Sequence, residues 1–328
     1  MSMPRFLRQT RPPARIIVVD SSDDPSDPER AVREASNGSP VEVTFVRGPR
    51  GASRQRNVGV ELVRAEVTMF PDDDSLWAND TAAEFMRVYD LDPAGRVGAI
   101  CGLPVPGFEQ IDGPGTAGGA YRTSASHELD VRVTRFRRHL AARTAPEPFV
   151  VLGRSFHAGW TLPPWCGEFD VVPVEWMTGF RMSFRTDAIR ANPFDENLSS
   201  YSLFEDACAS FAVMNSGRMV LAARRARVYH HRFPGKRGNG RGLGALQILN
   251  RAYIVALHSP PGHAARAALL PFSRGKCRSY LVRAFSRFGL DRFLGARAAT
   301  RHVPRFVDLP QGRALETYLE VRREVIGA

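Results

Sequence analysis

RIIVVDSSDD, residues 15–24, is a run of aliphatic residues that ends in Asp20 and a polar loop. A continuous β-branched run of this kind is typical of a strand in a parallel sheet that is covered on both faces. Similar strands are predicted at residues 41–46 and 66–70, and a helical segment is predicted before each of them. Strands that alternate with helices predict an α/β fold, with a doubly wound, mostly parallel central sheet flanked by helices.

Carboxylates stand at the predicted carboxyl ends of two of these strands. Asp20 ends the first strand, and FPDDD places Asp72, Asp73 and Asp74 directly after the third. Ligands of doubly wound sheets bind at this edge. Three adjacent carboxylates repel one another unless a cation, or a phosphate-bearing ligand with its metal, lies among them. The triplet therefore predicts a site for a divalent cation, with a solvated acidic turn as the alternative.

The charge of the chain limits the classes of function. The 328 residues carry a formal net charge of +11, from 45 Lys+Arg against 34 Asp+Glu. This basicity favours anionic partners such as nucleotides, phosphorylated lipids or an acidic membrane surface. A nucleic-acid partner is not predicted, because the sequence has no recognised motif or aromatic platform for one and the acidic triplet opposes it.

The cysteines and the apolar runs indicate a compartment. The four cysteines are far apart and form no CxxC pair, so the sequence predicts neither a disulfide framework nor a zinc site. No apolar run approaches the roughly 18 residues that span a bilayer, and the N-terminal segment lacks the apolar core of a signal peptide. These features predict a cytoplasmic protein.

The rest of the chain continues the α/β pattern and then becomes helical. The predicted elements are a helix at about 79–89, a strand at 97–105, an insertion at 106–170, a strand-like segment at 174–185, a helix that begins near Glu205, a strand at 219–231, and helices from about Leu243 onward.

A series of sequence blocks resembles, in order, the family 2 glycosyltransferases of the GT-A fold: IIVVDSSDD, GASRQRNVG, FPDDD, GFRMSFR, PFDENL, FEDACASFAV and VYHH. The resemblance implies an inverting, metal-dependent enzyme with Mn²⁺ or Mg²⁺ as its cofactor. Such an enzyme moves a sugar from a nucleotide-sugar donor to a hydroxyl group of a saccharide or lipid-linked acceptor. The usual context in the family is the synthesis of a surface polysaccharide or glycolipid.

The resemblance implies donor and metal roles for the acidic residues. Asp72 and Asp74 match the first and third positions of the family's DxD-type motif, so Asp72 is expected on the ribose side and Asp74 as a metal ligand. Asp72 also remains a candidate metal ligand, and Asp73 could share either role. Asp20 matches the acid that contacts the nucleobase, with a strand-end turn residue as the alternative.

Two further donor contacts follow from the resemblance. Arg56 in RQRN matches an arginine near the base and phosphates, and Arg54 is the alternative. The forked donors of a guanidinium suit phosphate recognition. Gly179 in GFRMSFR matches a position that leaves room for the sugar, although a bulge glycine is equally compatible with the pattern.

The last blocks supply a base and a further metal ligand by resemblance. Asp206 in FEDA matches the residue that deprotonates the acceptor hydroxyl, with Glu205 beside it. Acidic residues are also favoured at a helix N-terminus by its dipole, which is the structural alternative. Either His230 or His231 could bind the metal, but not both, because neighbours on a strand point to opposite faces.

The predicted domains follow from this pattern. Residues 1–240 are expected to form the catalytic domain, with a nucleotide-sugar-binding half at about 1–100 and an acceptor half at 101–240. Residues 241–328 are expected to form a helical, basic extension. Its segment 274–305 has nine basic residues and one acidic residue, with aromatic and aliphatic residues between them. A basic amphipathic helix of this kind predicts peripheral contact with an anionic membrane at its inner face, with a solvated helix as the alternative.

One part of the family pattern is absent. FLRQTRPPARIIVVD, residues 6–20, begins inside the helix that follows the family's usual first strand, so this strand is expected to be missing beside residues 16–19. An alternative function is therefore an N-terminally truncated, non-catalytic binding or scaffold protein. Strands paired on both edges of residues 16–19 would favour the enzyme. If Asp20, Asp74 and Asp206 met in one cleft, the enzyme or the non-catalytic relative would be favoured over a nucleic-acid binder.

Overall fold

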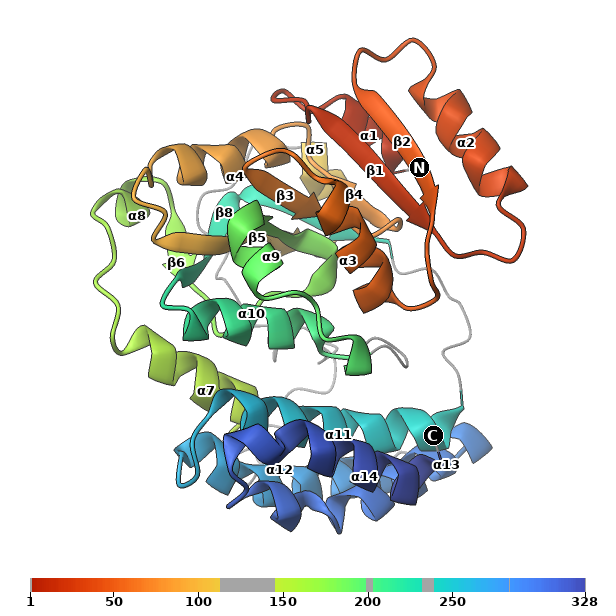
Figure 1. Cartoon of the computed structure of the whole chain (residues 1–328), viewed down its shortest axis with the longest axis vertical. Coiled ribbons are helices and arrows are strands. Elements are labelled where there is room, and N and C mark those ends of the chain that lie inside the picture. Colours follow the sequence, from red (N-terminus) through yellow and green to blue (C-terminus); the bar gives the residue numbers. More distant parts are fainter. Residues whose placement is uncertain (1, 113–144, 199–202, 232–238, 283, 328) are drawn as a thin grey trace. The chain divides into compact units, whose positions relative to one another are not determined.

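The computed structural model describes residues 2–112, 145–198, 203–231, 239–282 and 284–327. The chain divides into two compact units (Figure 1). The first unit consists of Met1–Tyr121 and Trp160–Pro234, and the second of Arg122–Gly159 and Gly235–Ala328. The predicted insertion 106–170 is thus shared between the units, and its residues 113–144 lie outside the described part of the chain.

The first unit begins with a two-stranded parallel sheet. Strand β1 (Arg15–Asp20) pairs with β2 (Glu42–Arg47) so that Ile16 lies opposite Val43 and Asp20 opposite Arg47. Helix α2 (Ser26–Ser36) connects the two strands, and α3 (Ala52–Leu62) follows β2. The strand–helix–strand–helix order predicted from the sequence is confirmed. Among the described residues, β1 has a partner strand on one edge only.

A second sheet of the first unit has six strands in the order β3-β7-β5-β8-β4, with β6 also paired to β8. Strand β7 is antiparallel to both of its neighbours, β3 and β5, so β3 and β5 run in the same direction. Strand β8 runs parallel to β5. Strands β4 and β6 are antiparallel to β8, so the directions are mixed. The strands are β3 (Val67–Phe70), β4 (Ser75–Trp77), β5 (Val97–Val105), β6 (Val171–Pro173), β7 (Met182–Arg185) and β8 (Met219–His230).

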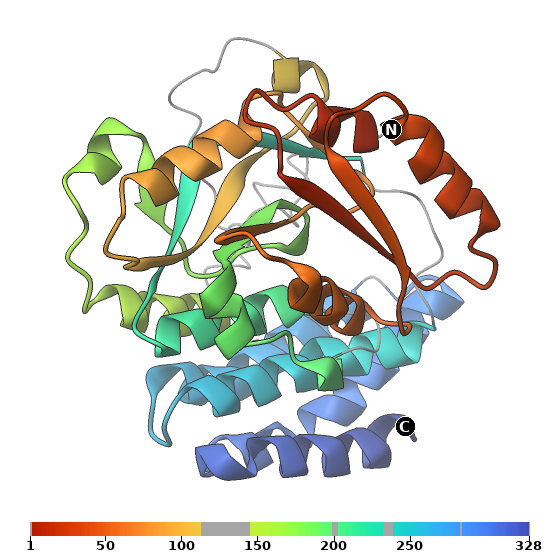
Figure 2. The same ribbon diagram turned by 45° about the horizontal axis from the view of Figure 1, so that its top comes forward.

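Helices cover both faces of this sheet, as an α/β fold requires. Helix α4 (Thr81–Asp90) and α10 (Glu205–Asn215) lie on opposite sides of β5 and β8 (Figures 1 and 2). Phe85 on α4 packs in a buried cluster with Trp77. The predicted α/β class is confirmed. The remaining short helices of this unit are α1 (Met3–Leu7), α5 (Glu109–Asp112), α8 (Trp165–Glu168), α9 (Thr186–Ala191) and the 3₁₀ turns Gly179–Arg181 and Glu196–Leu198.

The N-terminal segment is held to the six-stranded sheet. The ring of Phe6 on α1 meets the edge of Trp77, with 5.6 Å between ring centroids. Gln9 donates from its amide nitrogen to the carbonyl oxygen of Ala78 at 2.8 Å, and its amide oxygen accepts from the backbone N–H of Ala82 at 2.8 Å. These contacts satisfy backbone groups that β4 and α4 leave open at their junction.

The second unit is helical in its described residues, which confirms the predicted helical C-terminal region. Polar residues cap three of its helices: Asn239, His263 and Ser286 each accept a hydrogen bond from a backbone N–H of the first turn. No helix in the described part of the chain is both long and apolar enough to cross a membrane. The helices are α7 (Pro148–His157), α11 (Gly240–His258), α12 (Ala264–Leu281), α13 (Arg287–Thr300) and α14 (Ala314–Ile326), with 3₁₀ turns at Val303–Phe306 and Gln311–Arg313.

Glycines allow α11 and α13 to approach each other closely. A Cβ atom on Gly295 would overlap the carbonyl oxygen of Arg241, and one on Gly244 would overlap that of Arg292. Because both obstacles are backbone atoms, neither can move aside without separating the helices. We expect Gly295→Ala to lower the free energy of unfolding by about 2–3 kcal/mol.

Chemical denaturation of the Gly295→Ala variant tests this packing. Gly312→Ala is the matched control, since a Cβ atom there meets no atom within 4 Å. The control should change the free energy of unfolding by less than about 0.5 kcal/mol. Equal effects of the two substitutions would contradict the close helix contact.

Candidate active site

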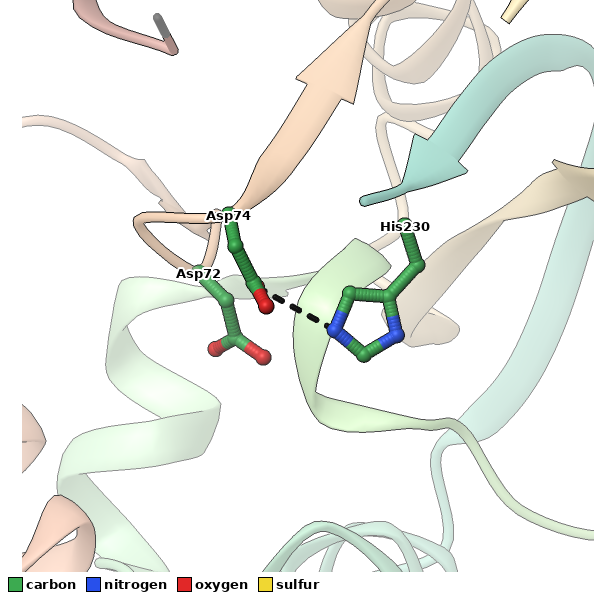
Figure 3. A group of neighbouring side chains, drawn as sticks. All are labelled: Asp72, Asp74 and His230. Carbon is green, nitrogen blue, oxygen red and sulfur yellow. Dashed lines mark hydrogen bonds and ion pairs between the residues drawn. The ribbon is translucent and has the colours of Figure 1, made fainter. Parts of the chain in front are cut away.

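Three potential metal ligands come together at the end of two strands. Asp72 and Asp74 lie in the turn between β3 and β4, and His230 ends β8 (Figure 3). Each offers one ligand atom, and these atoms all lie within 4.8 Å of one another. The spacing fits a divalent cation with oxygen and nitrogen ligands at about 2.0–2.3 Å. The structure thus brings together the two predicted aspartates and one of the two predicted histidines.

Strand pairing places His230 in this cluster. Ser75 of β4 lies opposite His230 of β8, so the turn before β4 reaches the end of β8. His230 Nε2 lies 3.1 Å from Asp74 Oδ1, and the ring of Phe180 stacks on the imidazole with 4.5 Å between centroids. Stacking fixes the plane of the ring and therefore the direction of Nε2. His231 contacts Asp74 differently, by donating its backbone N–H to the carbonyl oxygen of Asp74 at 2.9 Å.

Asp73 is not part of the group of potential metal ligands formed by Asp72, Asp74 and His230. Its carbonyl oxygen accepts a hydrogen bond from the Ser2 hydroxyl at 2.7 Å. Burial, together with the neighbouring carboxylates of Asp74 and Asp72, raises the pKa of Asp73. Burial is the larger cause, and repulsion between adjacent aspartates adds to it; a cation between Asp72 and Asp74 would oppose the increase in pKa.

Arg56 joins the acidic turn to helix α10. Its guanidinium donates to Asp72 Oδ1 at 2.9 Å and to Glu205 Oε1 at 2.8 Å. The guanidinium carbon lies 5.4 Å from the centre of the Phe194 ring, within the range of a cation–π contact. Burial alone would lower the pKa of Arg56, but the charges of Glu205 and Asp72 outweigh it and raise this pKa. The buried arginine therefore remains charged.

Gly179 leaves space for this arginine. A Cβ atom on Gly179 would lie 3.0 Å from a terminal nitrogen of Arg56, which is tighter than an ordinary contact. The sequence predicted that Gly179 makes room for a sugar, whereas the group that lies nearest in the structure is the guanidinium of Arg56. The glycine also donates its backbone N–H to Asp206 Oδ2 at 2.8 Å.

Glu205 and Asp206 begin helix α10, with Glu205 buried and Asp206 partly buried. Asp206 accepts two backbone hydrogen bonds, from Gly179 at 2.8 Å and from Ala207 at 2.7 Å. Burial raises the pKa of Asp206, although these N–H groups and Arg56 oppose the change. Burial and then the charge of Asp206 raise the pKa of Glu205 to about 8, against the effect of Arg56. A carboxylate with a raised pKa is a stronger base near neutral pH.

Two predicted donor contacts lie outside this network. Asp20 ends β1, and its carboxylate accepts from the backbone N–H and hydroxyl of Ser22 and from Arg47. Arg54 is about half exposed on α3, with its Nε 3.6 Å from Glu196. The structure therefore joins Asp74 to Asp206 through Asp72, Arg56 and Glu205, and it shows local partners for Asp20 and Arg54.

Two aromatic residues of the site had no assigned role in the sequence. Phe180 orients His230, and Phe194 lies against Arg56. Each stands inside a block that pointed to the site, GFRMSFR for Phe180 and PFDENL for Phe194. A single aromatic residue gives no sequence signal of this role, because most such residues pack in a core.

Comparisons with known proteins bear on the family and the fold of the chain. Residues 4–106 match the model of glycosyl transferase family 2. No curated protein matches the chain. Among solved structures, S. aureus TarS is similar, with a TM-score of 0.51 and 14% identity over 99% of this chain and 51% of TarS. A TarS structure of residues 1–349 has the same TM-score and identity, with 85% of that chain covered.

A third similar structure contains bound ligands. GalNAc-T7 with UDP, GalNAc and Mn²⁺ is similar with a TM-score of 0.50 and 13% identity, over 95% of this chain and 51% of that one. The chain thus spans about half the length of full TarS and of GalNAc-T7. At these identities the likeness shows the fold. Residues 4–106 are therefore similar to a glycosyl transferase family 2 domain, and the chain has a fold similar to that of the GT-A glycosyltransferases.

Proposed function

We propose that this protein is an inverting, metal-dependent glycosyltransferase that moves a sugar from a nucleoside diphosphate to a hydroxyl group. The observation that carries the proposal is the network in which Arg56 joins the cluster of Asp72, Asp74 and His230 to Glu205, the neighbour of Asp206 in the chain. A potential metal site and a partly buried carboxylate of raised pKa lie at its two ends. The transfer needs both, because a leaving diphosphate gains charge while the attacking hydroxyl loses a proton.

The metal ligands, the base and the positioning residues have separate roles in the proposed transfer. Asp72, Asp74 and His230 hold Mn²⁺ or Mg²⁺, which when bound would neutralise charge on the diphosphate. Asp206 accepts the proton of the acceptor hydroxyl. The oxygen of this hydroxyl then bonds to the anomeric carbon of the sugar, and the bond from that carbon to the diphosphate breaks. Glu205 and Arg56 position Asp206 relative to the acidic turn. Support for a donor of this class comes from the family match and from the UDP and Mn²⁺ in the similar GalNAc-T7 structure.

Asp20, Arg54 and Gly179 keep secondary roles in the proposal. Asp20 would contact the nucleobase from the end of β1, and Arg54 would approach the phosphates from α3. Gly179 would act chiefly by leaving space for Arg56, which then faces the phosphates. The acceptor is proposed to be a saccharide or lipid-linked sugar in surface polysaccharide or glycolipid synthesis, with peripheral contact to an anionic membrane.

A second candidate function is a non-catalytic relative that binds without transfer. Two observations favour it. Strand β1 has a partner on only one edge among the described residues, and the Asp20 carboxylate is already engaged by Ser22 and Arg47. A nucleobase contact would require Asp20 to share or exchange these partners.

Thermal melting with nucleotides distinguishes the two functions. The protein is melted with UDP, GDP or dTDP, each with and without Mn²⁺. A ligand at about 100 times its dissociation constant should stabilise the folded state by about 2.7 kcal/mol. We expect one nucleotide to raise the melting temperature, and only when Mn²⁺ is present, because Asp72, Asp74 and His230 would bind the nucleotide through the metal.

Two variants make this result specific. Asp74→Ala should abolish the Mn²⁺-dependent shift, since it removes one of the three ligands. Asp90→Ala is the control, because Asp90 is an exposed carboxylate on α4 that pairs with Arg11 at the surface. No shift with any nucleotide, or a shift that persists in Asp74→Ala, would favour the non-catalytic candidate.

A further inference from the structure

The second unit has a pocket of about 480 Å³ on helices α12 and α13. Four arginines line it, two from each helix. Arg274 and Arg278 are one turn apart on α12, and Arg297 on α13 is one turn before Arg301, the residue that caps the end of this helix. Residues at i and i+4 share a face of a helix, so each helix directs a pair of guanidiniums toward the same space.

These four arginines lack carboxylate partners. Within the residues that the structure describes, no Asp or Glu lies within 4.0 Å of their guanidinium groups. Other arginines of the same unit are paired: Arg305 bonds to Glu320 and Glu324 at 2.7 and 3.0 Å, Arg251 to Glu147 at 2.6 Å, and Arg313 to Glu316 at 2.6 Å. Among the described residues, the charge of the pocket is therefore not matched by a carboxylate of this unit.

The chemistry of the pocket selects for phosphate. Guanidinium groups present paired N–H donors that match the oxygens of a phosphate, and several of them around one space favour a multiply charged anion. Thr300 and Cys277 add polar atoms to the lining, with Thr300 Oγ1 3.2 Å from Cys277 Sγ. Four positive charges in one pocket repel one another, and a bound anion reduces this repulsion.

Large apolar side chains are exposed where α12 ends and α13 begins. Helices joined by so short a segment run antiparallel, so these residues lie together at one end of the pair. Phe285 between the helices is 95% exposed and Val282 is 70% exposed. An exposed cluster of large apolar residues marks a contact surface. The apolar end consists of Leu281, Val282, Phe285, Phe288, Leu290 and Leu294, which are 37% to 95% exposed.

The change from apolar to basic occurs at the same level on both helices. Leu281 follows Arg278 by three residues on α12, and Leu294 precedes Arg297 by three residues on α13. Three residues correspond to about 4.5 Å along a helix. The arginine pocket therefore begins about one helical turn from the apolar end. Phosphate groups of a bilayer lie at a similar small distance from the acyl boundary that apolar side chains enter.

We propose that the α12–α13 pair docks on an anionic lipid bilayer, with its apolar end in the interface and a lipid phosphate in the pocket of Arg274, Arg278, Arg297 and Arg301. This gives the membrane contact of the proposed function a site and a ligand. The docking itself needs neither a sugar donor nor transfer. Membrane binding and nucleotide binding can therefore fail separately.

Vesicle sedimentation of the full chain tests the proposal. Binding is measured to phosphatidylcholine vesicles and to vesicles that also contain phosphatidic acid. The pocket variant is Arg297→Gln/Arg301→Gln, and the control is Arg313→Gln/Arg323→Gln, which removes the same charge from other exposed positions of the unit. One basic residue at an anionic surface contributes about fivefold to binding, so the pocket variant should bind the acidic vesicles about thirtyfold more weakly.

Two further measurements, with a variant of the apolar end and with inorganic diphosphate as a competitor, identify the ligand. Leu281→Ser/Phe285→Ser should weaken vesicle binding without changing the melting temperature, because both side chains are exposed. Inorganic diphosphate at constant ionic strength should displace the wild type from acidic vesicles and leave the residual binding of the pocket variant unchanged. All variants should keep the nucleotide-dependent melting shift of the wild type, since the site of that shift lies in the first unit.

Several results would overturn the proposal. One is equal binding of the pocket variant and the charge-matched control to acidic vesicles. Another is sedimentation of the wild type with neither kind of vesicle. A shift of the melting temperature with inorganic diphosphate, lost in the pocket variant and without any vesicle binding, would assign the pocket to a free phosphate compound instead.

Discussion

Asp206→Asn is expected to lower the rate of sugar transfer by about 10²–10⁴-fold, which is the usual contribution of a general base. The amide has nearly the shape of the carboxylate but cannot accept the proton of the acceptor hydroxyl. Nucleotide binding should persist, since the residues proposed to hold the metal and donor are unchanged. Transfer is measured as release of the nucleoside diphosphate, and binding by the melting shift with Mn²⁺.

The surroundings of Asp206 define the controls for this prediction. Both of its carboxylate oxygens accept backbone N–H groups, from Gly179 and Ala207, and an amide can accept only through its single oxygen. Some loss of stability is therefore expected, and the rate must be measured well below the melting temperature. Glu205→Gln is the matched variant, because it removes the adjacent charge and keeps an acceptor for Arg56. A larger loss of rate in Glu205→Gln would assign the proton transfer to Glu205.

The sequence predicted the local elements well because their signals are local. The aliphatic run that ends in Asp20 is β1, and the acidic triplet follows β3 as expected for the end of a buried strand. The alternation of β-strands with helices likewise predicted the α/β class. Strand directions depend on pairing between distant segments, and β7 inserts between β3 and β5 as an antiparallel strand. No short stretch of sequence contains that information.

Contacts between distant segments of the chain also limited the prediction of the site. Resemblance to known blocks pointed to Arg56 and Glu205 separately, but their hydrogen bond joins residues 149 positions apart in the chain. Strand alternation predicted that only one of His230 and His231 could bind the metal. The position of His230 beside Asp74 follows from the pairing of β4 with β8, which the sequence does not reveal.

The C-terminal region shows how tertiary structure changes the meaning of a pattern. The basic segment 274–305 was predicted to be an amphipathic helix. The structure divides it between α12 and α13, with Ser286 capping the second helix. Two helices that pack side by side can surround a pocket, whereas a single helix offers only a stripe of charge. The exposed apolar residues are thereby gathered at one end instead of along one face.

Arg56→Met is expected to lower the free energy of unfolding by about 3–5 kcal/mol at about pH 9, where Glu205 is ionised, because it breaks a buried ion pair by removing one partner. The side chains of Arg56 and Glu205 are 14% and 7% exposed, so water cannot replace the lost contact. Arg54→Met is the control on the same helix. Arg54 is 47% exposed and its carboxylate partner lies 3.6 Å away, so its loss should cost less than about 1 kcal/mol.

The loss in Arg56→Met should depend on pH with a definite sign. Burial already raises the pKa of Glu205 to about 8 while Arg56 opposes the increase, so removal of Arg56 raises this pKa further. Below that pKa, Glu205 holds its proton in both folded proteins, and the difference in unfolding free energy is constant. Above it, the wild type ionises Glu205 beside Arg56, whereas the variant must bury an unpaired charge or keep the proton. The difference should therefore be larger at about pH 9 than at about pH 6.

Denaturant unfolding of three variants at both pH values measures this effect. In Arg56→Met/Glu205→Gln, no charge can form at position 205, so the extra loss at high pH should disappear. The double variant should also recover part of the stability lost in Arg56→Met, because residues that share a buried ion pair are not additive. A loss in Arg56→Met that equals the loss in Arg54→Met, or that shrinks as the pH rises, would show that the contact between Arg56 and Glu205 does not hold the acidic turn to α10.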